Sequence, residues 1–391
     1  MKKLLALLLS IVLVFSLVAC GENTADNTDN TENTVVETKP KTEINITKDE
    51  VQKIINGEFT APKNVIIIIG DGMGPNDITL AEQKLDSVYD FGLVLNQIKN
   101  TGFVTTRSAS DDITDSAAAA TALATGTKTT NGYIGVDPSG NELLNITEIA
   151  RQMGKKVGIV TDDKLSGATP SAFTTHNISR DNTSELISSI IKTKADVFMG
   201  EGYNNVFGPI DSEARAILDN EYVVAKDFKS FDTALDSDPN NQKKFLGIID
   251  KYSSVASDHL ALATQVALDR LQNENGFFLM IEGCGTDKFG QNNNINGKLN
   301  SVVTLDRTVA AVLKFMKENP DTLLIVTSDH DTGGAKLPKG DESLSSLLTT
   351  KEHTATDVRV FAVGKGSEYF ASKTVDNTDV AKFLIAAVKG E

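Results

Sequence analysis

The 391-residue sequence has no tryptophan, only two cysteines and only four histidines. The sequence around Cys20, described below, predicts that this cysteine is lipidated. Cys284 would then have no partner within the chain, so no disulfide would support the fold. Basic residues are also few, because 38 Lys and Arg stand against 53 Asp and Glu, for a net charge of −15. This acidic balance argues against nucleic-acid binding. Acidic clusters can instead hold metal ions.

The first 19 residues have the pattern of a secretory signal peptide. Two lysines precede an apolar run that is too short for a comfortable membrane span. The run ends in Leu17-Val18-Ala19-Cys20, which resembles a bacterial lipoprotein signal. We therefore predict a signal peptide over 1–19, lipidation of Cys20, and a secreted protein anchored to the outer face of a bacterial membrane. The alternative is an ordinary signal peptide that contains a chance cysteine.

Three further regions follow from composition. Residues 20–60 are rich in Asn, Thr, Asp, Glu and Lys, which predicts a disordered polar tether, or alternatively a partner-binding tail. Residues 61–391 are long enough for one large catalytic domain. Within that domain, residues 201–258 read as loops and short helices without a core of their own. We expect them to form an insertion at the rim of the site.

Short apolar, β-branched runs alternate with stretches of helical apolar spacing. This alternation predicts an α/β fold of three layers, with a mostly parallel central sheet and helices on both faces. The predicted strands are 65–69, 157–160, 277–281, 323–326 and 358–363, and the predicted helices include 260–271 and 302–316.

Acidic residues and a histidine closely follow three of the predicted strands. Asp71 stands between two glycines after the first, Glu282 follows another, and Asp329 and His330 follow a third. Because ligands gather beyond the carboxyl ends of strands in open α/β sheets, we expect these segments to converge on one crevice. Taken alone, Gly-Asp-Gly after a strand is more often a plain turn.

Ser116 precedes an Ala-rich segment that ends at Gly126, so it lies at or near the N-terminus of a predicted helix. An ordinary N-cap is the simple interpretation. The functional one is a hydroxyl held where free N–H groups and the helix dipole stabilise a phosphate.

The stretch from Asp115 to Gly132 closely resembles the nucleophile segment of the alkaline phosphatases, which place their phosphorylated serine at the position of Ser116. Further similar segments extend the resemblance from Val65 to Gly364. It implies a metal-dependent phosphate monoesterase that forms a phosphoserine.

The resemblance also implies a role for individual residues. Arg180 would clamp two phosphate oxygens with its guanidinium fork, although without this context a surface salt bridge would be the default interpretation. An inner metal would activate Ser116, and an outer metal would stabilise the leaving oxygen. The inner zinc would be held by Asp71, Asp329 and His330, the outer zinc by Asp287, Gln291 and His353, and a magnesium by Asp71, Thr169 and Glu282, while His176 and His259 are interpreted as structural.

Two positions depart from the family pattern. Gln291 stands where the family has a histidine, which predicts an outer site that is weaker for zinc. Gly167 stands where the family has an aspartate or a histidine near the magnesium. Lys288 resembles a lysine that some members pair with that missing acid. Unpaired, it would reach the phosphate through water, or else be an exposed surface lysine.

Other functions stay open at this stage. The chain is also compatible with a phosphodiesterase or sulfatase of the same superfamily, or with a lipoprotein that binds phosphate or metal without turnover. Retention of Ser116, Arg180, Asp329 and His330 favours the enzyme. The predicted partners are small phosphate esters and, through the lipid, a membrane; a homodimer is left open.

Overall fold

The computed structural model describes residues 44–84 and 89–391. The predicted signal peptide, Cys20 and the first part of the tether lie outside the described residues. Within the described part, no helix has both the length and the apolar character needed to cross a membrane.

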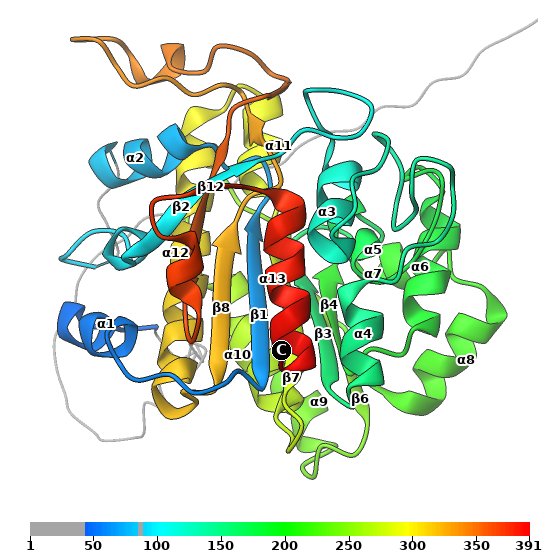
Figure 1. Ribbon diagram of the computed structural model, residues 1–391. Coiled ribbons are helices and arrows are strands. Elements are labelled where there is room, and N and C mark those ends of the chain that lie inside the picture. Colours follow the sequence, from blue (N-terminus) through cyan, green and yellow to red (C-terminus); the bar gives the residue numbers. More distant parts are fainter. Residues whose placement is uncertain (1–43, 85–88) are drawn as a thin grey trace, which may run out of the picture. The chain divides into compact units, whose positions relative to one another are not determined.

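A ten-stranded sheet forms the centre of the domain (Figure 1). Its strands are β1 (Asn64–Gly70), β2 (Asn100–Thr105), β3 (Lys156–Thr161), β4 (Val197–Glu201), β5 (Tyr222–Ala225), β6 (Lys244–Ile249), β7 (Phe277–Gly283), β8 (Thr322–Thr327), β11 (Val358–Val363) and β12 (Thr374–Asp376). Their order is β12-β2-β11-β8-β1-β7-β3-β4-β6-β5. Only β11 runs against its neighbours. The predicted mostly parallel sheet is therefore confirmed.

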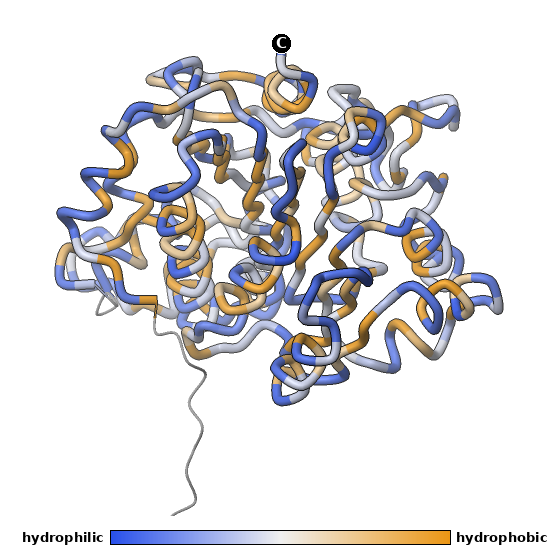
Figure 2. Tube along the Cα trace, turned by 90° about the horizontal axis from the view of Figure 1, so that it is seen from below, coloured by the Kyte–Doolittle hydropathy of each residue, from blue (hydrophilic) through white to orange (hydrophobic). Residues whose placement is uncertain are grey.

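Strand β1 shows why helices cover both faces of this sheet. Its side chains alternate, so Ile66 and Ile68 pack into one apolar cluster while Val65, Ile67 and Ile69 pack into another. In Figure 2 hydrophobic segments run through the interior of the domain. The first face is covered by α1 (Lys48–Ile55), α2 (Pro75–Lys84), α9 (Phe231–Asp236), α10 (His259–Leu271) and α12 (Ile295–Glu318), and the second by α3 (Ser116–Thr125), α4 (Ile146–Gln152), α5 (Ala168–Ala172), α6 (Thr183–Lys192), α8 (Ser212–Glu221) and α13 (Asn377–Lys389). The three predicted layers are confirmed.

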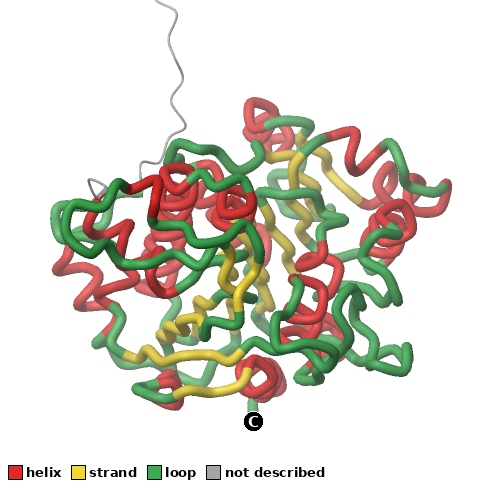
Figure 3. Tube along the Cα trace, turned by 90° about the horizontal axis from the view of Figure 1, so that it is seen from above, coloured by secondary structure: helices red, strands yellow, loops and turns green. Residues whose placement is uncertain are grey.

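The carboxyl ends of four neighbouring strands form one edge of the sheet. Ile69 of β1 pairs with Glu282 of β7 and with Thr327 of β8, and Thr161 of β3 pairs with the same glutamate. Figure 3 views the domain from the side toward which β1 and β8 point, where loops follow the strand ends. The segments after these strands therefore converge, as the sequence predicts.

The predicted tether ends too late, because residues 44–60 belong to the folded domain. Ile44 and Ile46 are buried, and α1 buries Val51 and Ile54 in the same apolar cluster as α12. The polar composition of this stretch hid a helix with one apolar face. A few apolar residues at the right spacing are enough to dock a short helix.

Residues 201–258 are not a rim insertion, which corrects a second prediction. They contain β5 and β6, which extend the parallel sheet beyond β4. Phe245 and Leu246 of β6 are fully buried, one in each apolar cluster. Both strands are short and lie between polar loops, so their apolar runs did not stand out in the sequence.

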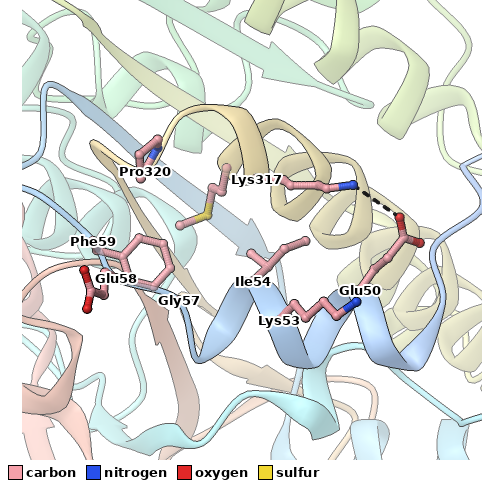
Figure 4. Close-up of a pocket in the computed structure, with 9 residues that line it drawn as sticks. Glu50, Lys53, Ile54, Gly57, Glu58, Phe59, Lys317 and Pro320 are labelled. Carbon is pink, nitrogen blue, oxygen red and sulfur yellow. Dashed lines mark ion pairs between the residues drawn. The ribbon is translucent and has the colours of Figure 1, made fainter.

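A groove of about 450 Å³ lies between α1 and the end of α12 (Figure 4). Ile54, Phe59 and Met316 line it, and Lys317 reaches Glu50 across 3.5 Å. The groove lies beside the start of β8, at the amino end of the strand, whereas the predicted site residues follow the carboxyl ends. It is therefore not the candidate site.

A buried ion pair fixes the turn that carries Asp71. Lys298 of α12 and Asp77 of α2 are fully buried and in direct contact. Lys298 Nζ also donates to the carbonyl of Gly72 at 2.9 Å, and the Gly74 N–H donates to Asp77 at 2.7 Å. Burial raises the pKa of Asp77 to about 6, against the opposing charge of Lys298. The pair thus holds the glycine turn at two points.

We expect Lys298→Met to lower the free energy of unfolding by roughly 3–5 kcal/mol, because it leaves the Asp77 carboxylate buried without a cation. The double variant Lys298→Met, Asp77→Leu should recover much of this loss, since neither charge is then buried alone. Urea unfolding followed by circular dichroism measures both. A single variant as stable as the double would contradict the role of this pair.

Candidate active site and metal centre

Ser116 is the first residue of α3, and its Oγ lies 3.1 Å from Nε2 of His330. The N-cap of the helix is Asp115, whose side chain accepts the Ala118 N–H at 2.9 Å. The simple interpretation of Ser116 as an N-cap is therefore wrong. Its hydroxyl is turned to the histidine instead, at the helix end where backbone N–H groups favour an anion.

Arg180 is oriented beside Ser116 by the same aspartate. Its Nη1 lies 2.9 Å from Oδ2 of Asp115, which also accepts the Gly132 N–H at 2.9 Å. The guanidinium carries five N–H donors and the Arg180 side chain is 34% exposed, so the fork retains donors for an anion. Arg180 thus contacts the residue that precedes Ser116, and its role as a phosphate clamp stays a prediction.

Asp71, Asp329 and His330 form the first of two groups of potential metal ligands, which we call the inner cluster. Their ligand atoms all lie within 4.8 Å of one another. Nε2 of His330 is 3.2 Å from Oδ2 of Asp329 and 3.6 Å from Oδ1 of Asp71. Those two carboxylate oxygens are buried and accept no hydrogen bond. Burial, with the charges of neighbouring carboxylates, raises the pKa of Asp71 well above its ordinary value. Oxygens without donors fit a bound cation.

Asp287, His330 and His353 form the second group, which we call the outer cluster, so His330 belongs to both clusters. The two imidazole rings stack with centroids 3.6 Å apart. Unlike Asp71, Asp287 already has donors: Thr332 Oγ1 at 2.7 Å, Gln291 Nε2 at 3.0 and 2.8 Å, and His353 Nε2 at 3.3 Å. Although burial opposes it, the hydrogen bond from His353 and nearby positive charge lower the pKa of Asp287. This carboxylate is satisfied without a cation.

Gln291, the last residue of α11 (Gly285–Gln291), faces Asp287 as the sequence spacing predicts. Its amide nitrogen donates to both carboxylate oxygens, so the nitrogen rather than the amide oxygen points at Asp287. A metal at this cluster would have to displace these bonds. The role of Gln291 as a ligand stays a prediction.

The predicted third site lies between β1, β7 and α5. Thr169 Oγ1 is buried and faces the Glu282 carboxylate, and Oδ1 of Asp71 is buried without a hydrogen-bond partner. Glu282 accepts a hydrogen bond from Thr161. Burial, with a contribution from the charge of Asp163, raises the pKa of Glu282 to about 8, although the Thr161 bond opposes the shift. A set of buried oxygens that includes two carboxylates fits a hard cation such as magnesium.

Lys288 is not unpaired, which corrects the expectation drawn from Gly167. Its Nζ lies 3.5 Å from Oδ2 of Asp163 and 3.5 Å from Oδ2 of Asp287. Against the effect of burial, the charges of Asp71, Asp287 and Asp163 raise the pKa of Lys288, so it stays an ammonium. Asp163 is a site residue that the sequence interpretation missed. The sequence does place an Asp-Asp pair after Thr161, just beyond the strand predicted at 157–160, but it does not show which residue Asp163 would contact.

The two remaining histidines lie outside both clusters. His176 contacts the Gly135 carbonyl at 2.8 Å and Glu148 at 3.3 Å. His259 is buried and lies 3.3 Å from Asp162. Both contacts are within the protein, in keeping with the structural interpretation.

Comparison with known proteins agrees with this geometry. The family model described as Alkaline phosphatase matches residues 62–219 and 237–347. Alkaline phosphatase 4 of Bacillus subtilis (strain 168) is 35% identical over 293 residues, which cover 70% of this chain and 62% of that protein, less than two thirds of its length. Alkaline phosphatase of Escherichia coli (strain K12) is 28% identical, with 83% of this chain and 86% of that protein covered.

Solved structures show the same likeness. Alkaline phosphatase from the Antarctic bacterium TAB5 superposes with a TM-score of 0.72 at 31% identity, covering 85% of this chain and 99% of that one. A variant of the TAB5 enzyme, which superposes equally well, holds Mg in a site termed M3. The family match, the shared fold and the two ligand clusters at the strand ends agree: this chain belongs to the alkaline phosphatase family.

Proposed function

We propose that this protein hydrolyses phosphate monoesters through a phosphoserine formed on Ser116. Membership of the family supports hydrolysis of phosphate esters. The observation that carries the finer proposal is the position of Ser116 Oγ, 3.1 Å from His330 at a helix N-terminus. Rates on monoester, diester and sulfate substrates, measured in parallel, test it. Faster turnover of a diester or a sulfate would contradict it.

The residues of the chain divide the reaction between them. Ser116 Oγ attacks phosphorus, the bond to the leaving oxygen breaks, and that oxygen takes a proton; water then cleaves the phosphoserine. Arg180 and the N–H groups at the start of α3 hold the phosphoryl oxygens as charge develops on them. Lys288 adds a third positive group close to Asp287. Metal ions at the clusters would supply Lewis-acid charge that lowers the pKa of the serine hydroxyl.

The chemistry of the donors supports zinc in the two clusters and magnesium in the third site. Both clusters contain imidazole, which suits zinc. The third site, with Asp71, Thr169 and Glu282, offers only oxygen, which suits magnesium. We propose that the outer zinc site is the weaker one, because Asp287 already has protein donors. We also propose small phosphate esters as the substrates.

We expect Ser116→Ala to abolish the phosphoenzyme and to lower turnover by several orders of magnitude, because only metal and electrostatic effects remain without the nucleophile. Labelled phosphate trapped at low pH and steady-state rates measure both effects. Near-normal turnover, or label on another residue, would overturn the assignment.

For localisation we propose a lipid anchor at Cys20 on the outer face of a bacterial membrane. The support is the sequence pattern around Cys20 alone. Cys20→Ser should move the protein from the membrane fraction to the soluble one, because a lipid chain is the anchor. Fractionation followed by immunoblotting checks this. Membrane association that persists in the variant would refute the anchor.

We expect Gln291→His to tighten zinc binding at the outer cluster by roughly tenfold, the scale of effects seen for groups that support a metal site. The substitution removes an N–H donor that competes for Asp287 and adds an imidazole nitrogen. Turnover at low zinc should rise in parallel. Zinc titration against a chelator measures the affinity.

Asn292→His is the matched control for this variant. The Asn292 side chain donates to the Lys288 carbonyl at 2.8 Å rather than to Asp287. The control should therefore leave zinc affinity unchanged. Equal zinc affinity in the Gln291 variant and the wild type would show that residue 291 plays no part in the outer site.

A further inference from the structure

Asp162 connects the end of β3 to the start of α11. Its Oδ1 accepts the backbone N–H of Cys284 at 2.7 Å, and its Oδ2 lies 3.3 Å from Nε2 of His259. Asp162, His259 and Cys284 are all buried. Cys284 is the residue directly before α11, the helix that carries Asp287 and Lys288. The Asp162 carboxylate thus holds the N-terminus of α11, the helix that carries Asp287 of the outer cluster.

The imidazole of His259 is itself held on both nitrogens. Nδ1 is in hydrogen-bond contact with Ser257 Oγ, while Nε2 faces Asp162. The backbone N–H of Ser257 donates to Thr304 Oγ1 of α12 at 3.1 Å. The loop after β6, the start of α10 and α12 therefore all support one ring, whose orientation is fixed by its partners.

A serine, a histidine and an aspartate in a row are also the components of a hydrolytic triad. The space available opposes that function here. The adjoining cavity, lined by Asp162 and His259, measures about 10 Å³. A space of that size holds at most one water molecule. The row is therefore suited to holding backbone in place rather than to binding a substrate.

Asp162 holds the start of α11 at a residue whose own side chain does not cap the helix. Cys284 occupies the N-cap position, and its side chain makes no capping hydrogen bond. Without Asp162 the buried Cys284 N–H would lose its acceptor, and an unpaired buried donor is costly. Any shift of this short helix would move Asp287, which lies three residues further along the chain.

We propose that Asp162, held by His259, is a positioning residue that sets α11, and with it Asp287 and Lys288, in the outer half of the site. This proposal rests on the proposed function only in assigning a metal to that half. It adds Asp162 and His259 to the groups on which zinc affinity depends, although neither belongs to a ligand cluster.

The test measures zinc binding in the full chain without substrate. His259→Leu removes the donor to Asp162 and should weaken the outer site by roughly 10-fold or more while leaving the inner site unchanged. His259→Gln should restore affinity, because its amide nitrogen reaches the place of Nε2. Asp287→Asn identifies which class of zinc site is the outer one. Chelator titration and the visible spectrum of the cobalt-substituted protein report on each site.

His176→Leu is the matched control, since His176 also contacts a carboxylate but lies away from α11. It should leave both zinc affinities unchanged. Outer-site affinity that is normal in His259→Leu, or equally reduced in the glutamine variant or the control, would overturn the proposal. So would a wild-type chain that binds no zinc at the outer cluster. If the leucine variant does not fold, the glutamine variant against Asp162→Ala gives the same comparison.

The two proposals fail in different ways. A shifted zinc affinity with no phosphomonoesterase turnover in the wild type would refute the proposed function and leave the positioning role standing. Full turnover with an unshifted affinity would do the reverse.

Discussion

The compensation of buried negative charge is the constraint on which this structure depends. Asp71, Glu282, Asp287 and Asp329 are all buried at the carboxyl ends of adjacent strands. Carboxylates in such a place need hydrogen-bond donors or cations, or else they take up protons. Asp287 has protein donors and its pKa is lowered, whereas Asp71 has an unpartnered oxygen and its pKa is raised. This contrast marks the inner half as the part of the site that most needs a cation.

The backbone around these carboxylates is held from outside the site. Lys298 and Asp77 hold the turn after β1, and Asp162 holds the start of α11 from the neighbouring strand end. Supports of this kind fix ligand geometry before any ion arrives, which lowers the cost of ordering on binding. The two supports differ in kind, because the first is a buried ion pair and the second is a hydrogen bond to a backbone N–H. They act on Asp71 and Asp287 respectively, one in each cluster.

Local signals in the sequence were sufficient to predict much of the fold and of the candidate site. The strand before Asp71 and the strand before Asp329 are unbroken apolar runs, so their ends could be placed and their convergence expected. The pair between Lys288 and Asp163 could not be read in this way, because it depends on the register that sets β3 beside β7. The same holds for His259 and Asp162, which are far apart in the sequence. The docked helix α1 was hidden by its polar composition.

The two halves of the site should accordingly fill in order. A cation entering the inner cluster meets oxygens of Asp71 and Asp329 that have no donors to give up. A cation entering the outer cluster must first break bonds from Gln291 and Thr332 to Asp287, so part of its binding energy is offset. His330 belongs to both clusters, so occupation of the inner one also fixes the ring that the outer one shares. Loading of the inner half should therefore prepare the outer half, where Asp287 has its protein donors.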